Sequence, residues 1–180
     1  MSEADELWHF WFETLGREDW FAGDPAVDTA LGARFAHLPD QAIAGALDAW
    51  TETPTGTLAL VLAVDQLPRH FWRGQARAFL GDAKARVVAS VAIAKGLDEV
   101  LGRDERLFLY LPFEHSEDLA DQDRACALIK TLGDPVYTDY AERHREVIRR
   151  FGRFPHRNAA LGRTSTPEED AFLAEVQAGF

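Results

Sequence analysis

Three pairs of a capping residue followed by proline constrain this chain most, because each pair marks the beginning of a helix. The pairs are Asp24-Pro25, Thr53-Pro54 and Asp134-Pro135. Asp and Thr side chains accept hydrogen bonds from the free N–H groups of a helix start, and proline at the first helical position has no N–H to leave unpaired. Apolar residues elsewhere recur at helical spacing, and no segment alternates like a strand. We therefore predict an all-α protein.

Further helices follow from the same spacing and from glycine or proline stops. The segment Leu58–Val64 is the most apolar of the chain, and we predict a buried helix here that Pro68 ends. Another proline follows Leu111, and Ser116 is expected to cap the next helix. The other expected helices are the N-terminal aromatic segment up to Gly16, a helix from Pro39 to near Trp50, and the ranges 78–97, 104–111, 116–132, 135–151 and 165–180.

Length and composition favour a single soluble domain. With 180 residues, of which 47% are hydrophobic, the chain can bury one core, and we expect one domain over residues 1–180. The seven-residue run Leu58–Val64 is far shorter than the roughly 20 residues that cross a bilayer. The acidic N-terminus also lacks the basic region of a signal peptide. A cytoplasmic protein without membrane contact is expected, and the single cysteine, Cys126, excludes an internal disulfide.

The net charge of −11 argues against nucleic-acid binding, which gains affinity by neutralising phosphates. The charge is distributed unevenly, however. Residues 143–163 contain seven arginines and one acid, so that this stretch carries +6 and the rest of the chain −17. Neutralisation by the acidic remainder is the simpler interpretation, and an anion-binding role is the alternative.

Three segments share a hydrophobic residue followed by proline and then by a basic residue within three positions. Their prolines, Pro68, Pro112 and Pro155, are 44 and 43 residues apart, with two predicted helices in each interval. A two-helix period of this size is typical of stacked helical hairpins of the tetratricopeptide kind. In such an array the three breaks would lie along one rim and bring together Arg69, His115, His156 and Arg157. The alternative is that the spacing is a coincidence.

His115 is the best candidate for acid–base chemistry. It follows Glu114, and a neighbouring carboxylate orients an imidazole and raises its affinity for a proton. His156 lies in the third proline segment and is the second candidate. We therefore predict Glu114, His115 and His156 as the catalytic residues. Asp121 lies further along, and the helix cap at Ser116 does not explain it.

A second group of residues is predicted to bind a ligand. Asp65 lies at the end of the most apolar helix, where a charge must be paired, and Arg69 four residues later is its expected partner. A structural ion pair is the favoured interpretation of these two residues. Arginine side chains can also hold carboxylates and phosphates with two parallel hydrogen bonds. The predicted ligand-binding residues are Asp65, Arg69, Arg73, Asp121, Arg157 and Asn158.

Motifs for other chemistries are absent from the sequence. A metal site from His115, Asp118, Asp121 and His156 is an alternative, but no pair of histidines with metal-binding spacing supports it. No glycine pattern of a phosphate loop, a dinucleotide fold or a serine-hydrolase elbow occurs. We expect neither a metal nor a cofactor. His144 lies among charged residues and is expected on a solvated helix face.

Three long motifs resemble a bacterial family called domain of unknown function 924. They are residues 65–74, 106–122 and 149–158, and the resemblance extends from the aromatic residues at 8–12 to Pro167. It implies an all-α, tetratricopeptide-like fold and no established activity. The family pattern has asparagine at position 70, where this chain has histidine. If this side chain contacts a ligand, the contact differs here.

Two functional hypotheses follow. The first is a polar groove that binds a small anionic ligand bearing a carboxylate or a phosphate, with acid–base catalysis by His115, Glu114 or His156 as an option. The second is a scaffold that binds a protein or an acidic peptide, with the same residues forming a structural polar network. The sequence does not determine whether the protein is an enzyme or which oligomeric state it adopts.

Overall fold

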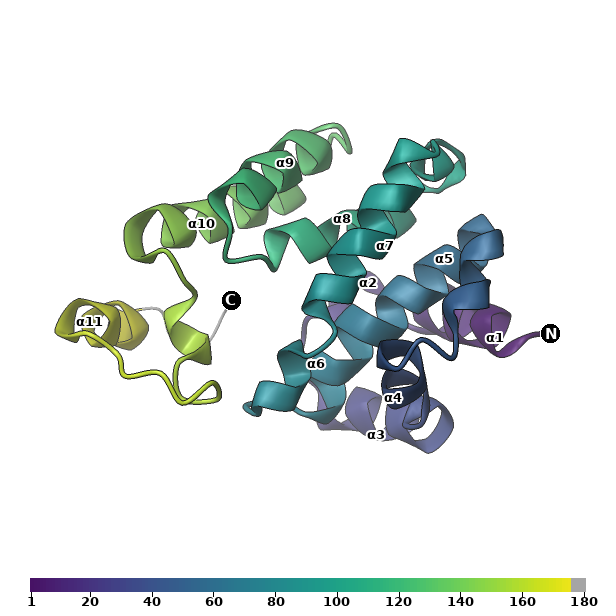
Figure 1. Ribbon diagram of the computed structural model, residues 1–180, viewed down its shortest axis with the longest axis horizontal. Helices are drawn as coiled ribbons and strands as arrows, with labels where there is room; N and C mark the ends of the chain where they lie inside the picture. Colours follow the sequence, from purple (N-terminus) through teal and green to yellow (C-terminus); the bar gives the residue numbers. More distant parts are fainter. Residues whose placement is uncertain (176–180) are drawn as a thin grey trace. The chain divides into compact units, whose positions relative to one another are not determined.

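The structure is a computed structural model, which describes residues 1–175. Within these residues all regular elements are helices, which confirms the predicted all-α class (Figure 1). The chain forms two compact units. Unit 1 comprises Met1–Arg73 and Arg77–Pro112, and unit 2 comprises Gly74–Ala76 and Phe113–Phe180. The single domain expected over residues 1–180 stays a prediction. No described helix has the length and apolar character that crossing a membrane requires.

The described residues contain α-helices, π-helices and 3-10 helices and no strand. The first part of the chain contains α1 (Glu3–His9), the π-helix η1 (Phe10–Thr14), α2 (Arg17–Trp20), α3 (Pro25–Phe35), α4 (Leu38–Ile43), the 3-10 helix η2 (Asp48–Glu52), α5 (Pro54–Val61), the π-helix η3 (Leu62–Gln66) and α6 (Leu67–Phe71). It continues with the 3-10 helix η4 (Ala76–Phe79), α7 (Asp82–Ala94), the 3-10 helix η5 (Leu97–Val100) and α8 (Arg103–Glu114). The last elements are α9 (Leu119–Lys130), α10 (Pro135–Phe151), the 3-10 helix η6 (Pro155–Arg157) and α11 (Pro167–Glu175).

The three predicted helix starts are confirmed. The side chains of Asp24, Thr53 and Asp134 each accept a hydrogen bond from a first-turn N–H, at 2.7, 3.0 and 2.9 Å respectively. In each case proline occupies the first helical position. Each cap therefore satisfies an N–H group that the helix itself leaves without a partner.

The segment Leu58–Val64 forms the centre of unit 1. All seven residues are completely buried, which confirms the predicted buried helix. The helix that contains them packs against α1 and α7. In unit 2, α9 and α10 pack against each other across a short turn and form a helical hairpin (Figure 1). A tetratricopeptide-like array stays a prediction.

The expected breaks at Pro68 and Pro112 are wrong. Helix α5 continues through the π-helix η3 into α6, and Pro68 lies in the first turn of α6. The π-helical hydrogen bond from the N–H of Leu67 to the carbonyl of Leu62 widens the backbone just before the proline, whose ring would clash with the carbonyl four residues earlier in a regular α-helix. Pro112 lies inside α8, which ends only at Glu114.

Several other boundaries differ from the sequence prediction. The helix that follows Pro112 begins at Leu119, and its cap is Asp118 and not Ser116. The helix expected from Pro39 to near Trp50 consists of α4 and η2 with a turn between them. The helix expected over 78–97 is shorter at both ends. The predicted end of the last helix, near residue 180, lies outside the described residues.

Gly81 provides a test of this packing. A Cβ atom at this position would lie 2.0 Å from the carbonyl oxygen of Val64. In a regular α-helix this oxygen would accept a hydrogen bond from residue 68, but Pro68 has no N–H. Because the obstacle is backbone, Gly81→Ala should lower the free energy of unfolding by about 1–3 kcal/mol. Gly32→Ala is the matched control, since its Cβ would lie at an ordinary 3.9 Å from the Phe71 ring. We expect this helical substitution to stabilise the protein by up to about 1 kcal/mol. Urea denaturation compares the two, and equal effects would contradict the packing argument.

Candidate functional site

In unit 1, Asp65 and Arg69 form the predicted ion pair. Asp65 is completely buried, and its Oδ1 lies 3.2 Å from Nη1 of Arg69, which also donates to the Asp65 carbonyl at 2.7 Å. The same guanidinium donates two parallel hydrogen bonds to Asp82, at 2.9 and 3.0 Å. Burial disfavours the charge on Arg69, but the two carboxylates outweigh it and raise its pKa. These contacts favour the structural interpretation of the pair.

A second network of unit 1 contains Arg73 and His70, and both contact Asp28. Nη2 of Arg73 lies 3.1 Å from Oδ2 of Asp28, and Nδ1 of His70 lies 2.6 Å from Oδ1. The His70 side chain is buried and meets the ring of Trp11 edge-on at 5.5 Å. Burial lowers the pKa of His70 despite the neighbouring carboxylate. His70 is therefore held by contacts within unit 1.

Unit 2 contains a different arrangement, centred on His144 and Glu114. Both residues are buried, and Nδ1 of His144 lies 3.3 Å from Oε1 of Glu114 and 2.8 Å from the carbonyl oxygen of Tyr140. Two oxygen atoms beside Nδ1 favour the tautomer in which this nitrogen carries the proton. Nε2 is then the basic atom of the ring.

Phe154 connects His144 with two of the predicted site residues. This ring is completely buried, and its centroid lies 5.6 Å from the ring of His144 and 5.6 Å from that of His156. The guanidinium carbon of Arg157 lies 4.5 Å from the same centroid. Three side chains from α10 and η6 thus contact one aromatic ring, which brings them together.

The pKa of His144 depends on its burial and on the groups around it. Burial is the main reason that it falls from 6.5 to about 3, although the hydrogen bond to the Tyr140 carbonyl opposes the change. Positive charges on His115, His156 and Arg157 lower it further. His144 is therefore neutral at physiological pH. We call Glu114, His115, His144, His156 and Arg157 the histidine cluster.

The backbone that carries His115 is held by Gln122. Its Nε2 donates to the carbonyl oxygens of Glu114 and Ser116, at 2.6 and 2.7 Å, one on each side of His115. The hydroxyl of Ser116 donates to Asp121 at 2.7 Å and accepts from the N–H of Asp118 at 3.2 Å. Asp121, a predicted ligand-binding residue, thus has a contact that stabilises the turn after α8.

Asn158 belongs to a buried polar network of unit 2. Its Oδ1 accepts from Nε of Arg163 at 2.9 Å, and its Nδ2 donates to Ser165 and Glu169 at 3.1 and 3.3 Å. Arg163 also donates to both carboxylate oxygens of Glu117. Hydrogen bonds from Arg153 and from the N–H of Thr166 lower the pKa of Glu169 to about 2. These contacts lock the segment after η6 in place.

The arginine-rich stretch is neutralised largely within unit 2. Six of its seven arginines pair with carboxylates: Arg143 with Asp139, Arg145 with Asp123 and Glu142, Arg149 with Asp123, Arg150 with Glu168, Arg153 with Glu169, and Arg163 with Glu117. This confirms neutralisation by acidic residues as the simpler interpretation of the charge run.

His144 is the residue of the cluster that the sequence prediction missed. It was expected on a solvated face, but its side chain is buried. Tyr137, Ala141 and Ile148 are also buried, and position 144 continues their helical spacing. The spacing of the buried residues in α10 could therefore have predicted that His144 is buried. Among the described residues, no group of three or more His, Cys, Asp or Glu side chains is arranged to hold a metal ion.

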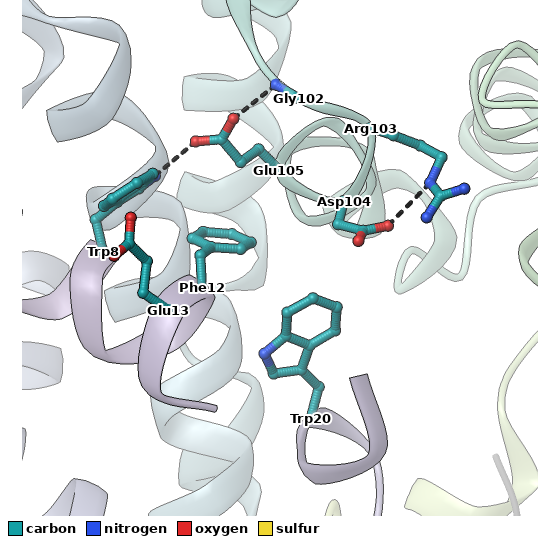
Figure 2. Close-up of a pocket in the computed structure, with 8 residues that line it drawn as sticks. All are labelled: Trp8, Phe12, Glu13, Trp20, Gly102, Arg103, Asp104 and Glu105. Atoms are coloured by element: carbon teal, nitrogen blue, oxygen red, sulfur yellow. Dashed lines mark hydrogen bonds and ion pairs between the residues drawn. The ribbon is translucent and has the colours of Figure 1, made fainter. Parts of the chain in front are cut away.

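A cleft in unit 1 contains none of the predicted site residues (Figure 2). Its volume is about 430 Å³. Aromatic residues of the N-terminal helices form one wall, and the beginning of α8 forms the other. The lining residues are Trp8, Phe12, Glu13, Trp20 and Gly102–Glu105. Trp8 and Phe12 are only partly buried.

Comparison with known proteins adds two findings. Residues 7–177 match the model of a family described as "Bacterial protein of unknown function (DUF924)". The solved structure of a protein of unknown function from Agrobacterium tumefaciens is similar, with 43% sequence identity, a TM-score of 0.91, and coverage of 96% of this chain and 97% of that chain. No curated protein matches the chain. Neither description names an activity, a ligand or a partner.

Proposed function

Since the chain belongs to DUF924, a bacterial family of unknown function, we propose its function from its own residues: the histidine cluster binds a small anion that carries a carboxylate or a phosphate. One observation carries this proposal. Three side chains that can carry positive charge, His115, His156 and Arg157, all disfavour the protonated form of the buried His144, which lies 3.3 Å from Glu114. Like charges gathered in a poorly solvated place repel one another, and a bound anion would offset this repulsion.

The chemistry of the cluster suits such a ligand. Arg157 has the forked donor geometry that matches a carboxylate or phosphate, and its contact with Phe154 restricts its side chain before binding. His156 is exposed and His115 is half-buried, so that both are within reach of solvent. The ligand would enter from the side of His115 and His156, because Glu114 and His144 are buried.

Acid–base chemistry would follow from ligand binding. A negative ligand next to His144 raises the pKa of this imidazole, because an opposite charge favours its protonated form. Glu114, which lies 3.3 Å away, stabilises the same form. Proton transfer by His115 or His156, supported by the pair of Glu114 and His144, is the catalytic role that we assign to these residues.

A thermal-shift titration with inorganic phosphate and succinate tests the proposal. At pH 6, phosphate at 100 times its Kd should add about 2.7 kcal/mol to the unfolding free energy and raise Tm. We expect His115→Asn and His156→Asn to reduce this shift strongly. Arg149→Gln removes one exposed positive charge from α10 and is the matched control, which should respond like the wild type. An equal shift in all four proteins would contradict a specific site at the cluster.

The alternative structural role is the better assignment for some predicted residues. Asp65, Arg69 and Asn158 make hydrogen bonds or ion pairs with protein groups in buried surroundings. We assign these three residues to stability. A scaffold for acidic peptides has less support, because six arginines of the basic stretch already pair with carboxylates of unit 2.

A further inference from the structure

The cleft of unit 1 has one aromatic wall. The rings of Trp8 and Phe12 lie 5.9 Å apart, and those of Phe12 and Trp20 lie 5.8 Å apart. The three side chains come from α1, η1 and α2 and line the same space (Figure 2). Aromatic faces carry negative partial charge and attract cations, most strongly for tryptophan.

The remaining lining residues add negative charge. Glu13, Asp104 and Glu105 contribute three carboxylates, and Arg103 contributes one cation, so that the lining carries −2. The Arg103 guanidinium lies 3.2 Å from Asp104, which reduces its effect on the cleft. Glu13 is exposed, and its Oε2 lies 3.4 Å from Nδ1 of His9.

Glu105 fixes the geometry of the cleft. Its Oε1 accepts from Nε1 of Trp8 at 2.6 Å, and its Oε2 accepts from the N–H of Gly102 at 2.6 Å (Figure 2). The indole edge of Trp8 is therefore held. Trp20 is held as well, because its Nε1 donates to the carbonyl of Trp11 at 2.8 Å. Rings that are fixed before binding lose little conformational entropy when a ligand arrives.

We propose that this cleft binds a small organic cation of the quaternary ammonium class. A primary ammonium must replace three hydrogen bonds to water, and both oxygens of Glu105 already accept one hydrogen bond from a protein donor, which leaves fewer acceptor sites. A quaternary ammonium has no N–H to satisfy, is weakly hydrated, and gains from aromatic faces and from nearby negative charge. The cleft volume of about 430 Å³ also suits a ligand of this size.

The negative lining favours a free cation over a headgroup that also carries a phosphate. Such a phosphate would approach Glu13, Asp104 and Glu105, and the negative charges of the phosphate and the carboxylates would repel each other. This makes the proposal independent of the histidine cluster, which takes anions and lies in unit 2.

Ligand-observed NMR titrations test the proposal with four probes. Tetramethylammonium and choline should bind. Added salt should weaken their binding, since part of the attraction comes from exposed charges. The neutral carbon isostere of choline, 3,3-dimethylbutan-1-ol, should bind at least about five-fold more weakly, because it lacks the cation–π attraction. Phosphocholine should also bind more weakly than choline.

Variants of the lining locate the site. Trp8→Leu should weaken choline about five-fold, and Trp8→Phe should weaken it less, because phenylalanine keeps an aromatic face. Glu13→Gln should weaken choline about two-fold, since the carboxylate is exposed. Glu146→Gln removes an exposed carboxylate from α10 and is the matched control, which should bind choline unchanged. Circular dichroism and thermal melts verify that each variant is folded.

Four results would overturn the proposal. Equal binding of the neutral isostere would show a merely apolar cleft, and phosphocholine as tight as choline would exclude the preference for a free cation. Absence of binding by both cations at about 10 mM would exclude a useful affinity, since even a Kd of 1 mM corresponds to only about −4.1 kcal/mol. If Trp8→Leu binds choline like the wild type while remaining folded, the site lies elsewhere.

Discussion

Arg69→Met is expected to lower the free energy of unfolding by about 3–5 kcal/mol. The substitution keeps much of the side-chain length but leaves the completely buried Asp65 and the largely buried Asp82 without the guanidinium between them. Two carboxylates that have lost this cation in a poorly solvated place are far less stable than the same groups in the unfolded chain. A melting temperature lower by about 10 °C should accompany the loss.

Arg143→Met is the matched control for this experiment. Arg143 pairs with Asp139 at 2.7 Å, but both side chains are more than half exposed. Such surface pairs contribute about 0–1 kcal/mol, because water screens the attraction. Chemical denaturation of both variants at pH 7 measures the difference. Similar losses of unfolding free energy in the two variants would show that Arg69 stabilises the protein no more than a surface arginine does. This result would contradict a stabilising network of Asp65, Arg69 and Asp82.

His144→Gln should change how stability depends on pH. The pKa of His144 is about 3 in the folded protein and 6.5 when the side chain is unperturbed. Between these values the unfolded chain binds a proton that the folded protein does not, so the wild type loses up to about 1.4 kcal/mol per pH unit as the pH falls below 6.5. Glutamine cannot take up this proton. The variant should be less stable than the wild type at pH 7, and this gap should shrink steadily towards pH 4.

Val147→Ala distinguishes this effect from a general loss of packing. Val147 is buried on the same helix and does not titrate, so its replacement should lower stability by a similar amount at every pH. Urea unfolding at half-unit steps from pH 4 to 7 measures all three proteins. If the curve of His144→Gln runs parallel to that of the wild type, His144 has the same pKa in the folded and unfolded states, and the electrostatic description of the cluster is wrong.

The sequence predicted those helix starts that depend on local chemistry. Asp24, Thr53 and Asp134 cap helices because the interaction involves only neighbouring residues. The stops at Pro68 and Pro112 were wrong, since buried packing around α5 and α8 outweighs what proline does to an isolated helix. The same limit applies to Ser116, whose hydroxyl bonds to Asp121 while Asp118 two residues later caps α9.

For the candidate sites, the sequence indicated which residue types need a partner better than it indicated where that partner lies. The ion pair of Asp65 and Arg69 was predictable from a four-residue spacing on one helix, but the second partner, Asp82, comes from another element. The contact between Glu114 and His144 likewise joins two helices that are distant in sequence. Trp8 and Glu105 are 97 residues apart, and no local pattern connects them. Interactions across such separations depend on packing that a single sequence does not reveal.

The π-helical segment Leu62–Gln66 makes room for Pro68 inside a continuous helix. A π-helical turn contains one residue more than the α-helical repeat, so it resembles an insertion within a regular helix. Deleting one residue here would restore the regular repeat and leave the residues after it on nearly the same helix face. The ring of Pro68 would then face a regular helical turn and clash with the carbonyl oxygen four residues earlier. We infer that such a deletion destabilises the helix through Pro68.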